Sequence, residues 1–339
     1  MDLRAVLRRQ SGPVGLVLVI VATWTVFGLG GTGFLTSFNL YTVGQLAARD
    51  AVLGMAQALL VVVGRMNLAV GSIGAVCTSM LGYLLVVAHW PLPLALVVVA
   101  VVGIAAALLM GLAELRTGLS SFIVTLAFLS IYGGGALFMT HARNYQITSS
   151  LLGRLGSGTV IFSAVCPLVV VALACALIVG VLYSRTSLGW KMLAVGANER
   201  AAKASGVNVD RVVLASYAVS GVFCAVAAVM ESSYELNVNA SFGENWLLPS
   251  FIAVVLGGIS LSGGEMFTFG ILLAALFYDS LQSGLTILNV PSYWVDLAQG
   301  SVLLAAVLLD RARHARKGRK RVRGPAEVVA PEEREVVAA

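Results

Sequence analysis

Residues 184–211 read SRTSLGWKMLAVGANERAAKASGVNVDR and lie between two long apolar stretches of the chain. Alanine favours helix, and the short run 197–204 contains four alanines. The segment also carries five basic residues: Arg185, Lys191, Arg200, Lys203 and Arg211. A basic, helical loop of this size in an apolar chain predicts a water-exposed segment that is held by a partner protein.

The composition around this loop is that of a membrane protein. Of all residues, 59% are hydrophobic and 11% are charged, whereas a soluble domain has about 25% charged residues. We therefore predict an all-α polytopic membrane protein with about ten transmembrane helices, some of them interrupted. The expected spans are 13–29, 49–63, 68–88, 93–113, 122–140, 164–183, 212–231, 246–261, 267–285 and 295–310.

One membrane domain accounts for nearly the whole chain. We predict a short N-terminal segment (1–12), a transmembrane domain (13–310) and a C-terminal tail (311–339). The tail begins basic and ends in a Pro- and Glu-containing stretch that we expect to be disordered. The first span is expected to be a retained helix, because its apolar run is longer than the core of a cleaved signal peptide.

The distribution of Lys and Arg predicts the orientation in the membrane. Basic residues precede the first span, and a dense basic cluster follows the last one. Both ends are therefore expected in the cytoplasm, which requires an even number of crossings. Ten spans place nearly all 22 Lys and Arg residues on the inner side, together with the loop 184–211. The outer side then holds only Arg49, Arg143 and Arg154.

Two interruptions of the apolar pattern resemble each other, at 61–71 and at 254–264. Aligned from their first residues, they share valines, a glycine at the fourth position, a leucine and a final glycine. Paired, glycine-interrupted segments in a membrane protein indicate a transport path. Two tight turns with a chance similarity are the alternative. The glycines expected at these helix breaks are Gly64, Gly71, Gly257, Gly258, Gly263 and Gly264.

Motifs for catalysis or cofactor binding do not fit this chain. The G-x-G-x-x-G pattern at 28–33 follows a membrane-length apolar run and lacks a strand–turn–helix context. A P-loop is absent from the sequence, and its three histidines form no metal-binding pair. The four cysteines fall in apolar spans and are expected to be small buried side chains. We predict no catalytic residue, no metal site and no cofactor bound by this chain.

Ionisable residues inside a membrane are costly and indicate function. Asp279 lies well inside the span 267–285, whereas Glu231, Glu235 and Asp296 are expected at the membrane interfaces. No intramembrane Lys or Arg is expected to accompany Asp279. An ion- or proton-coupled carrier requires an acid–base pair or an ion site, and therefore remains only an alternative class.

Four motifs in the same order resemble a known family. They are LAVGS (68–72), FIVTLA (122–127), GANERAAKASG (196–206) and AVVLGGISLSGG (253–264). Together they are similar to the permease subunits of ribose/galactose-type ABC sugar importers, which are related to branched-chain amino acid permeases. The resemblance extends from about residue 40 to 311.

Two positions depart from that family. Asn67 stands where the family usually has Asp, and Pro249 stands where many sugar permeases have Asp. The chain is therefore either a divergent member or one half of a heterodimeric pore. The Pro249 pattern is similar to one subunit of autoinducer-2 importers.

The resemblance implies an ABC importer permease fold and a set of partners. A second permease chain would complete the pore, an extracytoplasmic binding protein would deliver the solute, and a separate cytoplasmic ATPase would bind ATP and Mg. It also implies the bacterial inner membrane and no nucleic acid. The loop 184–211 becomes the docking loop, with an interfacial amphipathic helix as the alternative. The docking residues expected are Gly196, Asn198, Glu199, Arg200, Ala202, Ser205 and Gly206.

Uncharged polar residues are suited to a small, neutral, hydrophilic solute, because they exchange hydrogen bonds without binding tightly. A monosaccharide is the first expectation, with autoinducer-2, branched-chain amino acids or nucleosides as alternatives. The residues expected on or near the solute path are Asn67, Ser72, Phe122, Thr125, Tyr234, Asn237, Asn239 and Asp279. A solvated loop at 232–245 is the alternative for Tyr234 and the two asparagines that follow it.

Overall fold

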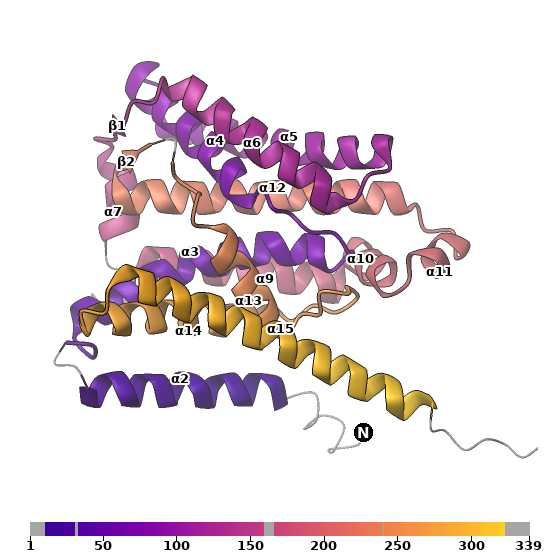
Figure 1. Ribbon diagram of the computed structural model, residues 1–339. Helices are drawn as coiled ribbons and strands as arrows, with labels where there is room; N and C mark the ends of the chain where they lie inside the picture. Colours follow the sequence, from indigo (N-terminus) through magenta and orange to yellow (C-terminus); the bar gives the residue numbers. More distant parts are fainter. Residues whose placement is uncertain (1–10, 31–32, 159–165, 240, 323–339) are drawn as a thin grey trace, which may run out of the picture.

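Long apolar helices lie side by side and make up most of the computed structural model (Figure 1), which describes residues 11–30, 33–158, 166–239 and 241–322. The long helices are α2 (Ser11–Gly30), α3 (Ser37–Val61), α4 (Val70–Gly82), α5 (Leu92–Thr117), α6 (Ser121–Thr140), α9 (Pro167–Arg185), α12 (Val209–Glu235), α13 (Leu247–Leu256), α14 (Thr268–Ile287) and α15 (Ser292–Val322). The shorter elements are the π-helical turn η1 (Tyr83–Val87), β1 (Tyr145–Gln146), α7 (Ser150–Ser157), α10 (Ser187–Ala197), α11 (Glu199–Ala204) and β2 (Asn237–Val238).

Helix α3 is the centre of the bundle. From Ala51 to Val63 every residue of this segment is buried, and the helix packs against α9, α12, α13 and α14. Its burial explains its mixed sequence: a helix surrounded by protein carries Gln45, Asp50 and Gln57 without exposing them to lipid.

Lipid-facing helices show the opposite pattern. Leu29 of α2, Val97 of α5 and Leu177 of α9 are large, apolar and exposed. Among the described residues, six helices are long and apolar enough to cross a membrane, and three shorter apolar stretches accompany them at 15–30, 247–256 and 292–308. The chain is thus a multi-pass membrane protein, whereas the expected count of ten crossings remains a prediction. The free cysteines Cys77, Cys166, Cys175 and Cys224 are all buried, as expected.

Three predicted boundaries are wrong. The second span was expected to begin at Arg49, but α3 begins at Ser37, so Arg49 lies in mid-helix and not on the outer side. The span expected at 246–261 is a helix of only 10 residues, α13. The last helix continues to Val322, so 311–322 is helical rather than a separate tail. The disorder predicted for the final stretch falls on 323–339, outside the described residues.

The helices alternate in direction along the chain. The first described residues of α2 and the last of α15 lie toward the same end of the bundle as α10 and α11 (Figure 1). The opposite end holds α7, β1 and β2, whose strands pair antiparallel through Tyr145–Val238 and Gln146–Asn237. This arrangement is compatible with the predicted orientation but does not show which end faces the cytoplasm.

Glycines bring α5 and α12 into close contact. A Cβ atom built on Gly221 would lie 2.3 Å from the carbonyl oxygen of Gly103, and one on Gly103 would lie 2.6 Å from that of Gly221. Small residues allow the backbones of membrane helices to approach in this way.

The close contact makes a stability prediction. Gly221→Ala should lower the thermal stability of the purified protein in detergent, by about 1–3 kcal/mol, because the helices must move apart. Gly180→Ala on α9 is the matched control, since a Cβ at Gly180 meets nothing within 4 Å. Equal melting temperatures for the two variants would contradict this packing.

Candidate functional site

The first helix break ends α3 with a Schellman motif. Arg65 N–H donates to the carbonyl of Leu60 (2.9 Å), and Gly64 N–H donates to that of Val61 (2.9 Å). Gly64 has φ +75°, the left-handed conformation that a helix C-terminus of this type requires and that glycine adopts most easily. The chain then resumes as α4 at Val70.

The second break ends α13 in the same way. Ile259 N–H donates to Val254 (3.1 Å), Gly258 N–H donates to Val255 (3.1 Å), and Gly258 has φ +83°. The structural partner of Gly64 is therefore Gly258. The expected alignment with Gly257 is wrong by one residue, since Gly257 still has right-handed helical angles.

The other predicted break glycines have different roles. Gly263 and Gly264 have positive φ and lie in the connection that leads to α14. Gly71 is not in a break: it lies in the first turn of α4, where a Cβ would come within 1.9 Å of the carbonyl of Gly243. Because Gly71 has no side chain, the loop that precedes α13 can pack directly against it.

The two breaks and the loop 186–208 meet at one junction. Gly264 N–H donates to the carbonyl of Val62 (2.9 Å), which joins the second break to the first. A Cβ on Gly196 would lie 1.7 Å from Val62 O and 2.6 Å from Gly264 N, so only glycine fits there. The end of α10 therefore lies directly on both breaks.

The loop itself is two short helices with well-defined ends. Asn198 ends α10 and caps α11, accepting a hydrogen bond from Ala201 N–H (3.0 Å). Gly206, at φ +82°, closes α11 with a further Schellman pair: Gly206 N–H donates to the carbonyl of Lys203 (3.0 Å), and Val207 N–H donates to that of Ala202 (3.1 Å). Ser205 donates to the carbonyl of Ala201 (3.0 Å). The ends of both short helices are thus fixed by hydrogen bonds within the loop.

The exposed residues of α11 lie on one side of it. Glu199, Arg200 and Lys203 are exposed, whereas Ala202 is only 6% exposed and packs toward the core. Ala202 therefore cannot present its side chain to a partner, contrary to its place among the expected docking residues. The exposed face is polar and carries two basic residues.

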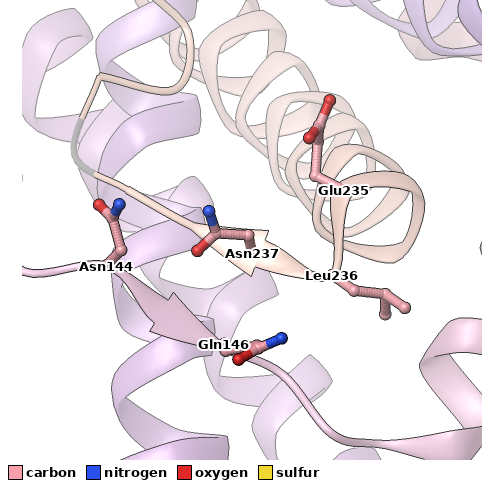
Figure 2. Close-up of a pocket in the computed structure, with 5 residues that line it drawn as sticks. All are labelled: Asn144, Gln146, Glu235, Leu236 and Asn237. Carbon is pink, nitrogen blue, oxygen red and sulfur yellow. The ribbon is translucent and has the colours of Figure 1, made fainter.

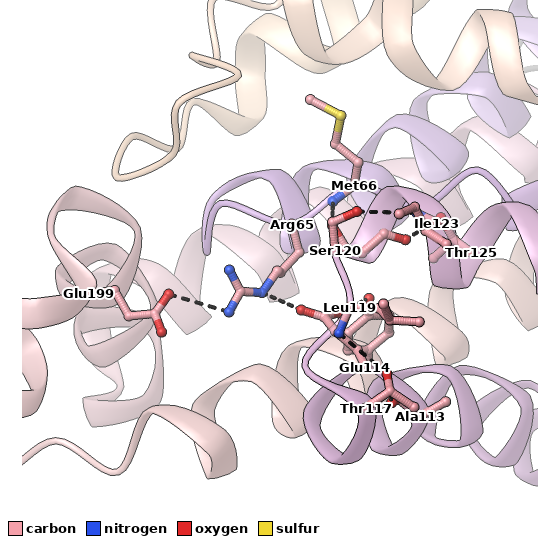
Figure 3. Close-up of polar contacts among 12 residues, drawn as sticks. Arg65, Met66, Ala113, Glu114, Thr117, Leu119, Ser120, Ile123, Thr125 and Glu199 are labelled. Carbon is pink, nitrogen blue, oxygen red and sulfur yellow. Dashed lines mark hydrogen bonds and ion pairs between the residues drawn. The ribbon is translucent and has the colours of Figure 1, made fainter.

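Arg65 connects the loop 186–208 to the membrane helices (Figure 3). Its guanidinium lies 2.5 Å from Glu114 at the end of α5 and 3.3 Å from Glu199 of α11. Glu114 also accepts a hydrogen bond from the Tyr217 hydroxyl of α12 (2.6 Å). Arg65, which lies within the first break, thus contacts α5 and α11. Through Glu114 it is also linked to Tyr217 of α12.

Polar residues of α6 satisfy the backbone that the first break frees. Thr125 Oγ1 accepts from Leu68 N–H (3.1 Å), and Ser121 Oγ accepts from Met66 N–H (3.1 Å). Asn67 Oδ1 accepts from Ala69 N–H (2.8 Å). Asn67 and Thr125 are fully buried, so in this conformation they stabilise the break rather than line an open path.

The remaining predicted path residues near this break differ in exposure. Ser72, partly buried, donates to the carbonyl of Ala69 (3.1 Å), and Phe122 is 52% exposed on α6. Their place on a solute path stays a prediction.

A polar hollow lies at the opposite end of the bundle (Figure 2). Its volume is about 420 Å³, and it is lined by Asn144, Gln146, Glu235, Leu236 and Asn237. Predicted path residue Asn237 is thus at the hollow, whereas neither Tyr234 nor Asn239 is among its lining residues. Tyr234 is 36% exposed, and Asn239 accepts from Ser241 N–H (2.9 Å).

Asp279 is not alone in the membrane, contrary to expectation. Arg49 of α3 pairs with Asp50 (2.7 Å) and with Glu231 of α12 (2.7 Å), so buried ion pairs lie in the same helix bundle as Asp279 of α14. The sequence predicts a span that begins at Arg49 and so places this arginine on the outer side. Helix α3 begins 12 residues earlier, which puts Arg49 in mid-helix.

Comparison with known proteins identifies the family. Residues 39–307 match the model described as branched-chain amino acid transport system / permease component. The chain belongs to this family. The family is a transport permease component, which is not itself catalytic, and permeases of ABC importers act in general with ATPase and binding-protein partners. No solved structure matches the chain.

Three curated relatives cover nearly the whole permease. It is 28% identical over 306 residues to the autoinducer 2 import system permease protein of Salmonella typhimurium, covering 89% of this chain and 92% of the relative. It is 28% identical over 309 residues to the ribose import permease protein of Bacillus subtilis (91% and 94%). It is 25% identical over 367 aligned positions to the xylose transport system permease protein of Escherichia coli (89% and 91%).

Sequence reasoning missed Arg65, Glu114, Arg49 and Asp50. Arg65 had a usable signal, since it is a charged residue inside one of the two quoted breaks. Glu114 lies 49 residues away, and nothing in the local sequence connects the two.

The Arg65–Glu114 pair makes a second prediction. Arg65→Met should destabilise the permease strongly, by about 3–5 kcal/mol, because Glu114 is left as a buried and uncompensated charge. The double variant Arg65→Met/Glu114→Gln should recover part of this loss, as measured by thermal melting in detergent. Arg116→Met, an exposed arginine in the last turn of α5, is the control and should have little effect. Additive losses in the double variant would refute the pairing.

Proposed function

We propose that this permease is the membrane-spanning subunit of an ATP-driven importer for a small neutral hydrophilic solute, most simply a monosaccharide. Relatives named for ribose and xylose transport, each covering about nine-tenths of the chain, support this substrate class. The galactose/methyl galactoside import permease protein of Haemophilus influenzae, 28% identical over 237 residues, supports it further.

The observation that carries the proposal is the junction of the loop 186–208 with both helix breaks. A movement of α11 reaches the first break through Glu199 and Arg65, and reaches both breaks through the backbone contact of Gly196. An importer driven by a soluble ATPase needs such a rigid connection from the membrane surface to the transport path. The junction is that connection.

The assembly follows from this role. An ATPase subunit, which binds ATP and Mg, docks on the exposed face of α11 from the cytoplasm. A second permease chain completes the pore, and an extracytoplasmic binding protein delivers the solute at the end that carries the hollow lined by Asn144 and Asn237. The permease lies in the bacterial inner membrane, with both termini in the cytoplasm.

Two observations favour other functions. Pro249 and the autoinducer 2 permease relative favour autoinducer-2 as the solute and a heterodimeric pore. The buried charges around Asp279 favour an ion-coupled carrier. Solute uptake by proteoliposomes separates these classes: an ABC importer requires internal ATP, while an ion-coupled carrier requires an ion gradient.

Charge reversal on α11 tests the docking. Arg200→Glu/Lys203→Glu should reduce ATP-dependent monosaccharide uptake by tenfold or more, about 1.4 kcal/mol of lost ATPase binding, with membrane insertion unchanged. Arg154→Glu, exposed on α7 at the opposite end, is the control and should leave ATPase binding intact. Undiminished uptake by the α11 variant would overturn the docking assignment.

Fusion reporters test the orientation. A reporter that is active only in the periplasm should be silent when fused after residue 310 and active when inserted within 141–158, because both termini and α11 are assigned to the cytoplasm. Activity at both positions would mean that the number of crossings between them is even rather than odd, and the reverse pattern would contradict the assigned orientation.

A further inference from the structure

Three ionisable side chains from two helices meet within the membrane domain, away from the junction, and a fourth, Asp279, is buried on a third helix of the same bundle. Arg49 and Asp50 come from α3, Glu231 from α12 and Asp279 from α14. Arg49 donates from Nε to Asp50 Oδ1 and from one terminal nitrogen to Glu231 Oε2, both at 2.7 Å. One cation is thus shared by two carboxylates, whereas no ion pair or hydrogen bond among the described residues joins Arg49 to the third carboxyl group, that of Asp279.

Burial differs within this charge cluster. The side chains of Arg49 and Glu231 are 16% and 10% exposed, so they reach toward water. Asp50 and Asp279 are each 1% exposed. Both oxygens of Asp279, and Oδ2 of Asp50, have no hydrogen-bond partner among the described residues. Of the two deeply buried carboxyl groups, Asp279 is therefore the less compensated.

The other elements packed on α14 bring no cation to Asp279. The described parts of α2, α9 and α13 that pack on it supply apolar and uncharged groups, such as Trp24, which donates to Ser280 (2.9 Å). Helix α15 presents an exposed carboxylate, Asp296, and a buried amide, Gln299. Arg49 forms its ion pairs with Asp50 and Glu231, and no described cation pairs with Asp279.

We propose that Asp279 is a membrane-embedded proton site, whose carboxyl group holds one proton in the folded permease. With all four groups ionised, one positive charge would face three negative charges in a medium of low dielectric constant. An unpartnered buried carboxylate is far more costly there than a neutral carboxylic acid. The guanidinium of Arg49 compensates the negative charges of Asp50 and Glu231. Asp279 has no such partner, so its carboxyl group is the one that holds the proton.

A proton fits this site better than a metal ion. Among the described residues, no three His, Cys, Asp or Glu side chains come together as metal ligands. The proposal depends on this cluster alone, so it stands or falls independently of the transported solute.

Infrared spectroscopy of the full-length permease in lipid tests the proposal at neutral pH. A protonated carboxylic acid has a carbonyl stretching band that a carboxylate lacks. We expect one such band in the wild-type protein, shifted when the protein carries aspartate with a ¹³C side-chain carboxyl and not when glutamate is labelled. The band should be lost in Asp279→Asn, and it should persist in the control Asp210→Asn at the exposed start of α12.

Each other outcome overturns the assignment. An absent band means that Asp279 is ionised, and a band that persists in Asp279→Asn belongs to another acid. A band seen with choline but lost when sodium is added means that a metal cation, not a proton, occupies the site. Where Asp279→Asn fails to fold, Asp279→Glu keeps the test decisive: its band should shift with labelled glutamate and no longer with labelled aspartate, which a band from Asp50 would not do.

Discussion

A bilayer offers no water to backbone groups, so every N–H and C=O that leaves a helix there must find a partner in the protein. This constraint shapes the centre of the permease. Each break ends its helix with a Schellman pair around a left-handed glycine, Gly64 or Gly258. Hydroxyl groups of α6 then take up the amides of Met66 and Leu68. Non-helical chain at this depth is possible only because neighbouring elements are built to satisfy it.

The same constraint explains why the loop 186–208 is tied so closely to the transmembrane helices. The Val62 carbonyl, left free by the end of α3, accepts from Gly264 of the second break. Gly196 packs on that pair with no room for a side chain. The hydrogen bonds that the broken helices need thus also fix the loop 186–208 against both breaks. Arg65 adds a second connection, through charges rather than backbone.

Charges inside the bundle follow a related rule. Arg65 and Glu114 are tolerated because they pair and because Tyr217 satisfies the remaining carboxylate oxygen. Around Arg49 the compensation is incomplete, since one guanidinium serves two carboxylates and a third has no partner among the described residues. An ion pair with further polar partners is what a structural role requires, whereas a buried carboxyl group with neither marks the place where the protein must bind something more.

The sequence by itself determined the class of the protein and the place of its loop. Apolar runs of membrane length, a basic helical segment between them and four ordered motifs were sufficient for a membrane permease, because hydropathy and local motifs are properties of contiguous residues. Only the tertiary structure decided that Arg49 lies in mid-helix, that Gly64 matches Gly258, that Ala202 faces inward and that Arg65 meets Glu114. These facts depend on where a helix begins and which helices pack together. Both depend on contacts between residues that lie far apart in the chain.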